Sequence, residues 1–190
     1  MNKKTDWIEV KIAMDEGHHL AMAYNRSMMA AATEWVLFLD HDLFFCNPHW
    51  YQMALYATQN APVDAGWITA VTNRIGNKAQ RASFGDPEED SLMPPPNTED
   101  VSLHCKYAKM LYDHWGNKLI RCRGAMSGFF ILTSKRAWQA AGGFDEGRKR
   151  LLGVDNRYSS SLSVAGFRHY KLPGLYFYHM YRHKKRFMRW

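Results

Sequence analysis

Short apolar runs alternate along this chain with stretches whose apolar residues recur at helical spacing. The runs are bounded by polar or turn-forming residues, and they predict strands at 7–13, 36–39, 66–71, 129–132, 169–172 and 175–178. The helically spaced stretches predict helices at 15–32, 47–59, 98–116, 134–142 and 155–165. Strands that alternate with helices indicate an α/β sandwich with a mainly parallel central sheet.

Polar residues and glycines mark where these helices should begin and end. The predicted N-caps are Asp15, Asn47 (followed by Pro48), Thr98 and Ser134. The predicted stops are Gly116, Gly142 and Gly166. Residues 86–100 hold six acidic residues, four prolines and no basic residue, which predicts an exposed loop.

The run at 36–39 ends in Asp40-His41-Asp42, which is the most informative feature of the chain. A strand buried on both faces delivers these residues at its carboxyl end, where α/β folds keep their ligand crevices. Two carboxylates beside so much apolar surface are costly unless a hard divalent cation compensates their charge. We therefore expect a metal that grips a phosphorylated substrate, with a simple capped strand end as the alternative.

Size and composition predict one globular domain over residues 1–181 with a separate tail over 182–190. The chain has 190 residues, of which 46% are hydrophobic, and this suffices for a core. No apolar run approaches the length of a membrane span, and no signal peptide precedes the first strand. Cys46, Cys105 and Cys122 form no C-x-x-C pair, so we expect reduced thiols and a cytoplasmic protein.

The net charge of +7 favours anionic partners such as phosphates, nucleic acid or a membrane surface. Much of this charge lies in the tail, where Arg182 and further bases alternate with Phe187, Met188 and Trp190. Such a tail suits peripheral contact with an anionic bilayer, although a solvated terminus explains it equally well.

Four segments, in order, resemble the GT-A glycosyltransferases, especially family 2. They are Glu16–Asp42 (with Asn25 inside the helix and then Asp-x-Asp), Ser127–Trp138, Gly142–Glu146 with Gly153-Val154-Asp155, and His179-Met-Tyr-Arg182. Each segment alone is a weak signal, but four in the family's order are fairly specific. The resemblance implies a GT-A-like (Rossmann-like) fold and transfer of a sugar from a nucleotide-sugar donor to an acceptor hydroxyl.

The resemblance also implies a Mn²⁺ or Mg²⁺ ion at the end of the first buried strand. Asp42 would bind this ion directly, and Asp40 would meet the ribose or a metal-bound water. His179, with His183 as second choice, would complete the metal site. An ordinary half-buried histidine among aromatic residues is the alternative for His179.

For the sugar transfer, the resemblance implies inversion with Asp155 as the base. Val154 stands where the family has an acid, and Asp155 could instead serve as an N-cap. Asp145 fits a structural turn better than a catalytic role.

Basic and small residues near predicted strand ends would bind the donor. Arg182, Arg74 and Arg123 offer planar donor forks to a diphosphate, with Asn73 beside Arg74 at the pocket edge. Gly128 would let the backbone approach the sugar. Each of these, taken alone, also fits an ordinary surface base or a routine glycine.

The match fails at the N-terminal side, where the family binds the nucleotide base with a strand, a helix and a strand. Only about fourteen residues precede the Glu16 helix, so the GT-A unit is truncated there. Three alternatives remain open: a minimal enzyme, a second subunit (a homo-oligomer or partner) that completes the site, and a fragment or degenerate relative that no longer turns over.

Two rivals come from other classes. A nucleotidyltransferase also uses Asp-x-Asp, but the chain has no Gly-rich phosphate loop. A non-catalytic module for polyanions or nucleic acid would explain the charge, but it predicts bases spread over one face. The acceptor, whether glycan, lipid-linked or protein, is not determined by the sequence.

Overall fold

The computed structural model describes residues 7–12, 19–85, 93–147 and 153–180. Over these residues seven strands form one sheet: β1 (Glu9–Lys11), β2 (Trp35–Leu39), β3 (Leu43–Phe45), β4 (Ala65–Thr72), β5 (Ile120–Cys122), β6 (Phe130–Ser134) and β7 (Arg168–His179). The strand order is β1-β2-β6-β4-β7-β3, and β5 pairs with the first part of β7. The helices are α1 (Leu20–Ala30), α2 (Trp50–Gln59), α3 (Val101–Trp115), α4 (Lys135–Ala140) and α5 (Val154–Val164), with a short 3-10 turn, η1 (Lys78–Gln80).

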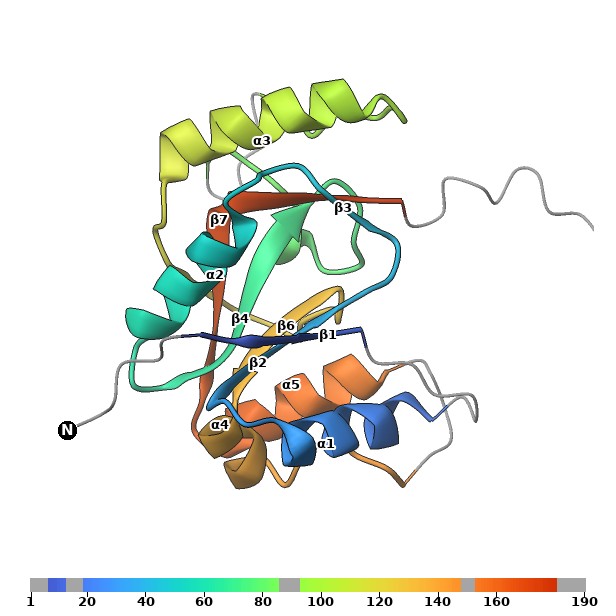
Figure 1. Ribbon diagram of the computed structural model, residues 1–190, viewed down its shortest axis with the longest axis vertical. Helices are drawn as coiled ribbons and strands as arrows, with labels where there is room; N and C mark the ends of the chain where they lie inside the picture. Colours follow the sequence, from blue (N-terminus) through green and yellow to red (C-terminus); the bar gives the residue numbers. More distant parts are fainter. Residues whose placement is uncertain (1–6, 13–18, 86–92, 148–152, 181–190) are drawn as a thin grey trace, which may run out of the picture.

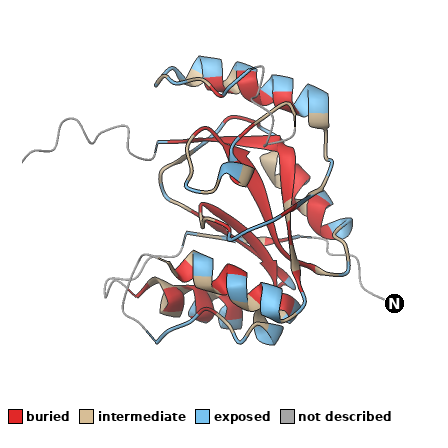
Figure 2. Cartoon of the chain, turned by 180° about the vertical axis from the view of Figure 1, so that it is seen from behind, coloured by how far each residue is buried: buried red, intermediate tan, exposed pale blue. Residues whose placement is uncertain are grey.

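Helices cover both faces of the sheet, which explains the continuous apolar runs (Figure 1). On one face, α1, α4 and α5 pack against Val36, Phe38 and Ile131. On the other face α2 packs against alternate residues of the same strands, and α3 covers the last part of β7. Figure 2 shows the resulting burial along the sheet and the inward helix faces. The predicted α/β sandwich is confirmed.

The prediction of a mainly parallel sheet was wrong, because the sheet is mixed. Among the strands of the described residues, only the β1–β2 and β4–β7 pairs are parallel. β6 runs antiparallel to β2 and β4, and β3 and β5 run antiparallel to β7. The apolar runs report burial on both faces, and helices on both sides bury a strand of either direction equally well.

Two predicted strands near the C-terminal end form the single strand β7. The register of β7 with β4 shifts between Thr69 and Val71, at the point where Pro173-Gly174 lies in β7. A side chain at Gly174 would collide with the carbonyl oxygen of Gly116, which follows α3. The absence of a Cβ at Gly174 therefore allows the α3–β5 connection to cross this strand closely. The strands β3 and β5 were not predicted, because three residues are too few for a clear alternation.

The predicted caps were partly right. Ser134 caps α4 through its hydroxyl, which accepts from the backbone N–H of Ala137. Asp100, not Thr98, caps α3, and His49, not Asn47, precedes α2. Asn47 instead accepts from the backbone N–H of His49 and forms the turn that leads into α2. Asp15 lies outside the described residues.

The remaining expectations concern the tail, the acidic loop, the cysteines and membrane spans. The tail 182–190 and most of the acidic part of the 86–100 loop lie outside the described residues. All three cysteines carry free thiols. Within the described ranges, no helix combines the length and apolar character that crossing a bilayer requires.

Candidate metal and catalytic site

Two strand ends bring the predicted metal ligands together. Asp40 and Asp42 follow β2, and His179 is the last residue of β7. The strand β3 begins directly after Asp42 and pairs with β7, so that Leu43 lies opposite His179. The backbone N–H of Met180 donates to the carbonyl oxygen of Asp42 at 3.0 Å. The antiparallel β3–β7 pair thus carries the Asp-x-Asp turn from β2 across to the end of β7.

Side-chain atoms of these three residues form a compact group. The Nε2 atom of His179 lies 3.2 Å from Oδ1 of Asp42 and 3.8 Å from Oδ2 of Asp40. One ligand atom from each residue lies within 4.8 Å of the others, so the group could bind a metal ion. The His179 side chain is 4% exposed, whereas the two carboxylates reach solvent.

A hydrogen bond of the His179 ring determines which of its two nitrogens has a lone pair that faces the carboxylates. Nδ1 lies 3.1 Å from the carbonyl oxygen of Arg74, which can only accept, so Nδ1 carries the proton. Burial, the largest effect, lowers the pKa of His179 and favours the neutral ring, although the charge of Asp42 acts in the opposite direction. The neutral ring then presents the Nε2 lone pair to two carboxylates, an arrangement that a bound cation stabilises.

Asp40 is held at the end of β2 under electrostatic stress. Its backbone N–H donates to the carbonyl oxygen of Phe129 at 3.0 Å, which extends the β2–β6 pairing by one residue. Burial, followed by the negative charge of Asp42 and a smaller effect of Asp155, raises the pKa of Asp40 to about 7. A bound cation would remove this penalty, because it favours the ionised carboxylate.

Asp155, the predicted base, lies in the first turn of α5. Its N-cap is Gly153, with a φ of 80°, so the alternative of Asp155 as the N-cap was wrong. Oδ1 of Asp155 accepts from the backbone N–H of Asn156 at 2.8 Å, and Oδ2 accepts from that of Gly128 at 2.9 Å. A carboxylate in this position is favoured by the helix dipole.

Gly128 and Phe129 join the carboxylate of Asp155 to the metal group. The N–H of Gly128 holds Asp155, while the carbonyl oxygen of Phe129 holds the backbone of Asp40. The Phe129 ring also stacks on the His179 ring, with centroids 5.8 Å apart. Phe129 was predicted only as a strand residue, and its place beside His179 had no signal in the sequence.

Asn73 and Arg74 lie behind His179. Oδ1 of Asn73 accepts from the backbone N–H of His179 at 2.8 Å and from the hydroxyl of Thr72 at 3.0 Å. The Nδ2 atom of Asn73 is buried and has no hydrogen-bond partner among the described residues. The Arg74 guanidinium donates to the side chain of Asn97. Both residues adjoin the metal group, and their contact with a substrate stays a prediction.

Asn25 makes contacts that were not expected for a substrate-binding residue. Its Nδ2 donates to the carbonyl oxygen of Phe144 and to Glu146, and its Oδ1 accepts from the backbone of Phe144 and from Trp138. All four hydrogen-bonding positions of the amide are used in this way. In this structure Asn25 fastens α1 to the Gly-Gly-Phe-Asp-Glu loop, and a contact with substrate stays a prediction.

The other predicted residues divide into three groups. Asp145 is a turn residue, because it accepts from the backbone of Gly147 and pairs with Arg157 at 2.9 Å. Arg123 lines a separate pocket with Arg121 and does not line the metal group. Arg182 and His183 lie outside the described residues.

Tyr24 was predicted only as a helix residue, yet burial and the charges of Asp40 and Asp155 raise its pKa.

Comparison with known proteins gives a likeness in fold. No family model matches the chain, and no curated protein matches it. A solved mannosyltransferase, PcManGT from Pyrobaculum calidifontis in complex with GDP-Man and Mn²⁺, matches with a TM-score of 0.51 at 13% identity. The match covers 87% of this chain and 37% of that one, so this chain spans little more than a third of its length. The chain therefore has a glycosyltransferase-like, GT-A-like fold, at a distance that shows the fold alone.

Proposed function

We propose that this protein transfers a sugar from a nucleoside-diphosphate donor to an acceptor hydroxyl, with Mn²⁺ or Mg²⁺ bound by Asp40, Asp42 and His179. The observation that carries the proposal is the short backbone link between the candidate metal-ligand set and the carboxylate of Asp155. The N–H of Gly128 holds the carboxylate of Asp155, and the carbonyl oxygen of the next residue, Phe129, holds the backbone of Asp40, which belongs to the candidate metal-ligand set. Metal-assisted departure of a diphosphate and removal of a proton require these two groups side by side.

The donor set fits a hard or borderline divalent cation. Two carboxylate oxygens suit Mg²⁺ and Mn²⁺, and a neutral imidazole nitrogen favours Mn²⁺ over Mg²⁺. The Arg74 carbonyl oxygen fixes the ring tautomer that exposes Nε2 for this purpose. When bound, the ion would neutralise the charge that gathers on the diphosphate as the glycosidic bond breaks.

The base reaction follows from the position of Asp155. As the acceptor oxygen attacks the anomeric carbon, a carboxylate oxygen of Asp155 takes the proton from the acceptor hydroxyl. The new bond joins the acceptor oxygen to the anomeric carbon, and the bond to the diphosphate breaks with its electron pair on the leaving group. One displacement on the face opposite the leaving group inverts the anomeric centre. The N–H groups of Gly128 and Asn156 keep the carboxylate in place.

The remaining predicted residues would bind the donor. The buried Nδ2 atom of Asn73 is an unused donor next to the metal group, and Arg74 and Arg182 would supply positive charge to the diphosphate. The solved mannosyltransferase with a similar fold contains GDP-Man and Mn²⁺, which supports a nucleotide-sugar donor. A second copy or another subunit would supply contacts to the base if this chain lacks them.

Calorimetric titration with GDP and with UDP, each with and without Mn²⁺, tests the proposal. We expect binding that requires Mn²⁺ and disappears in Asp42→Ala. Asp113→Ala is the matched control, because Asp113 is an exposed carboxylate on α3 that pairs with Lys109. Failure of both nucleotides to bind in the presence of Mn²⁺ would contradict the proposal, as would equal binding by the wild type and Asp42→Ala.

A further inference from the structure

A second polar cavity lies along α5, away from the metal group. It has a volume of about 410 Å³, and residues of β5, the following loop, α5 and the start of β7 line it. Asp155 lies at the start of α5, whereas the lining residues Ser159 and Ser163 come later in the same helix. A rise of 1.5 Å per residue puts them roughly 6 and 12 Å beyond Asp155 along the helix axis. His179 is at the opposite end of β7 from the lining residues Arg168 and His169.

The cavity is lined by cations and neutral polar groups, with no carboxylate among its lining residues. Arg121, Arg123 and Arg168 contribute three guanidinium groups. None of the three forms an ion pair within the described parts of the chain. The carboxylate of Asp64, which precedes β4, accepts from the hydroxyl of Tyr170 at 2.8 Å.

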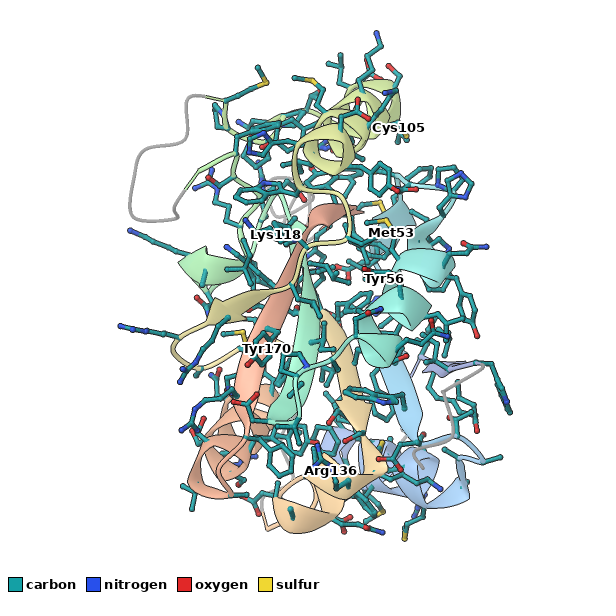
Figure 3. The ribbon with its side chains drawn as sticks, turned by 90° about the vertical axis from the view of Figure 1, so that its left-hand side faces the viewer. Met53, Tyr56, Cys105, Lys118, Arg136 and Tyr170 are labelled. Atoms are coloured by element: carbon teal, nitrogen blue, oxygen red, sulfur yellow. The ribbon has the colours of Figure 1, made fainter. Side chains whose placement is uncertain are left out.

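Strand pairing keeps these arginines together. β5 runs antiparallel to the start of β7, so Arg121 lies opposite Tyr170, and Cys122 lies opposite His169. Figure 3 faces this edge of the sheet, with Tyr170 labelled beside β5. The Arg168 guanidinium donates to the backbone carbonyl oxygens of Gly166 and Phe167, which fixes it at the turn after α5. The side chains of Arg121 and Arg123 are exposed and free of such bonds among the described contacts.

Serine and histidine side chains form the neutral part of the wall. Ser159 Oγ accepts from the backbone N–H of Met126 at 3.1 Å and lies 2.8 Å from Nε2 of His169. Burial lowers the pKa of His169, so its ring is neutral at physiological pH. His169 is only 4% exposed, and its buried Nδ1 atom has no hydrogen-bond partner within the described residues. A buried polar atom of this kind is costly unless water or a ligand satisfies it.

From this wall we infer a second ligand site, one that binds a phosphoryl-type oxyanion without using the metal group. Arginine forks match the oxygens of a phosphate. The cavity has room for more than one phosphate group. The hydroxyl oxygens of Ser160 and Ser163, whose protons go to backbone carbonyl oxygens, can accept from the hydroxyls of a phosphorylated sugar. The inference does not depend on the proposed transferase activity, because it concerns binding alone.

The test is calorimetric titration in EDTA with inorganic phosphate, glucose 6-phosphate and glucose, supported by backbone amide NMR shifts. We expect saturable binding of inorganic phosphate and of glucose 6-phosphate, with changes in the amide NMR shifts of Gly124, Ala125 and Ser160. Binding should weaken by about tenfold or more in the Arg121→Gln/Arg123→Gln double variant, as expected for lost hydrogen bonds to a charged group. Tighter binding of glucose 6-phosphate than of inorganic phosphate would show that the sugar is also recognised; equal binding would assign the affinity to the phosphoryl group.

Two control variants make the result specific. Arg26→Gln removes one exposed positive charge from α1, and Arg26 contacts only Met22 among the described side chains. Asp42→Ala alters the metal group. Neither variant should change phosphate binding in EDTA. The inference is overturned if no phosphate probe binds, if glucose binds as well as its phosphate, if Arg26→Gln weakens binding as much as the double variant, or if Asp42→Ala abolishes it.

Discussion

The backbone N–H of Gly128 donates to Oδ2 of Asp155 at 2.9 Å, and a Cβ at position 128 would lie 3.1 Å from the Cβ of Asp155. The glycine therefore lets the loop before β6 touch the start of α5 closely enough to hold the carboxylate. The sequence suggested that Gly128 admits a sugar, and the structure shows that it admits Asp155.

Replacing Gly128 by alanine should reduce turnover while leaving nucleotide binding nearly intact. The new methyl group requires Asp155 to shift by a few tenths of an ångström, which moves the proposed base. Because a displacement of about 1 Å can cost roughly 100-fold in rate, we expect a loss smaller than that. Steady-state kinetics with Mn²⁺ and the donor identified by binding would measure the turnover of Gly128→Ala relative to the wild type. Gly76→Ala is the matched control, because its Cβ would meet only Ser127 Oγ, at 3.6 Å. An unchanged rate in Gly128→Ala would contradict the prediction.

Replacing Asp155 by asparagine should abolish most of the activity without removing the donor site. The amide can still accept a hydrogen bond from Gly128 but cannot take a proton, so the rate should fall by roughly 10² to 10⁴. Single-turnover kinetics together with nucleotide titration separates the chemical step from binding. Retention of full activity would exclude Asp155 as the base.

Replacing His179 by glutamine should weaken Mn²⁺ binding, measured by electron paramagnetic resonance of free Mn²⁺. The variant loses a ring nitrogen whose lone pair is oriented by the Arg74 carbonyl oxygen. Because loss of a group that merely orients a metal ligand costs about 10- to 100-fold in affinity, we expect loss of the proposed ligand to cost at least as much. His114→Gln, on α3, is the control. Equal Mn²⁺ affinity in His179→Gln and wild type would remove His179 from the site.

Replacing Asp40 by asparagine should stabilise the metal-free protein at high pH. The pKa of Asp40 is raised from 3.8 to about 7 in the folded chain, so the folded state binds more protons than the unfolded state between these values. Wild-type stability therefore falls as pH rises through this window, and the neutral amide avoids the loss.

Thermal unfolding in EDTA at pH 5 and pH 8 measures this effect. The gain of Asp40→Asn over wild type should be larger at pH 8, although solvent screening limits it, because 41% of the Asp40 side chain is exposed. Asp113→Asn, at an exposed position on α3, is the control. A gain that is equal at both pH values would refute the raised pKa.

Replacing Asn25 by alanine should destabilise the fold by about 2–4 kcal/mol, because it leaves buried partners at Phe144 without hydrogen bonds. Urea unfolding measures the free energy. Ser27→Ala, which removes one local hydroxyl bond to Ala23 on the same helix, should cost far less. Similar values for the two variants would show that the amide does not anchor the loop.

Local pattern was enough to place most of the elements and the acidic turn. The run at 36–39, its ending in Asp40 and Asp42, and the cap at Ser134 all depend on residues adjacent in the chain. Their physics is local: burial of an apolar run, the cost of carboxylates beside it, and a hydroxyl that satisfies a helix N–H. Asp155 at a helix start was predictable for the same reason.

Strand direction and side-chain meetings were decided only by the tertiary structure. The pairing of β6 with β2 and β4, the approach of His179 to Asp42 and the hydrogen bond from His179 to Asn73 join residues far apart in sequence. An apolar run specifies that a strand is buried but not which neighbour it takes or in which direction it runs. The sequence by itself therefore determined which residues are candidates for chemistry, and the packing of distant strands determined which of these candidates meet.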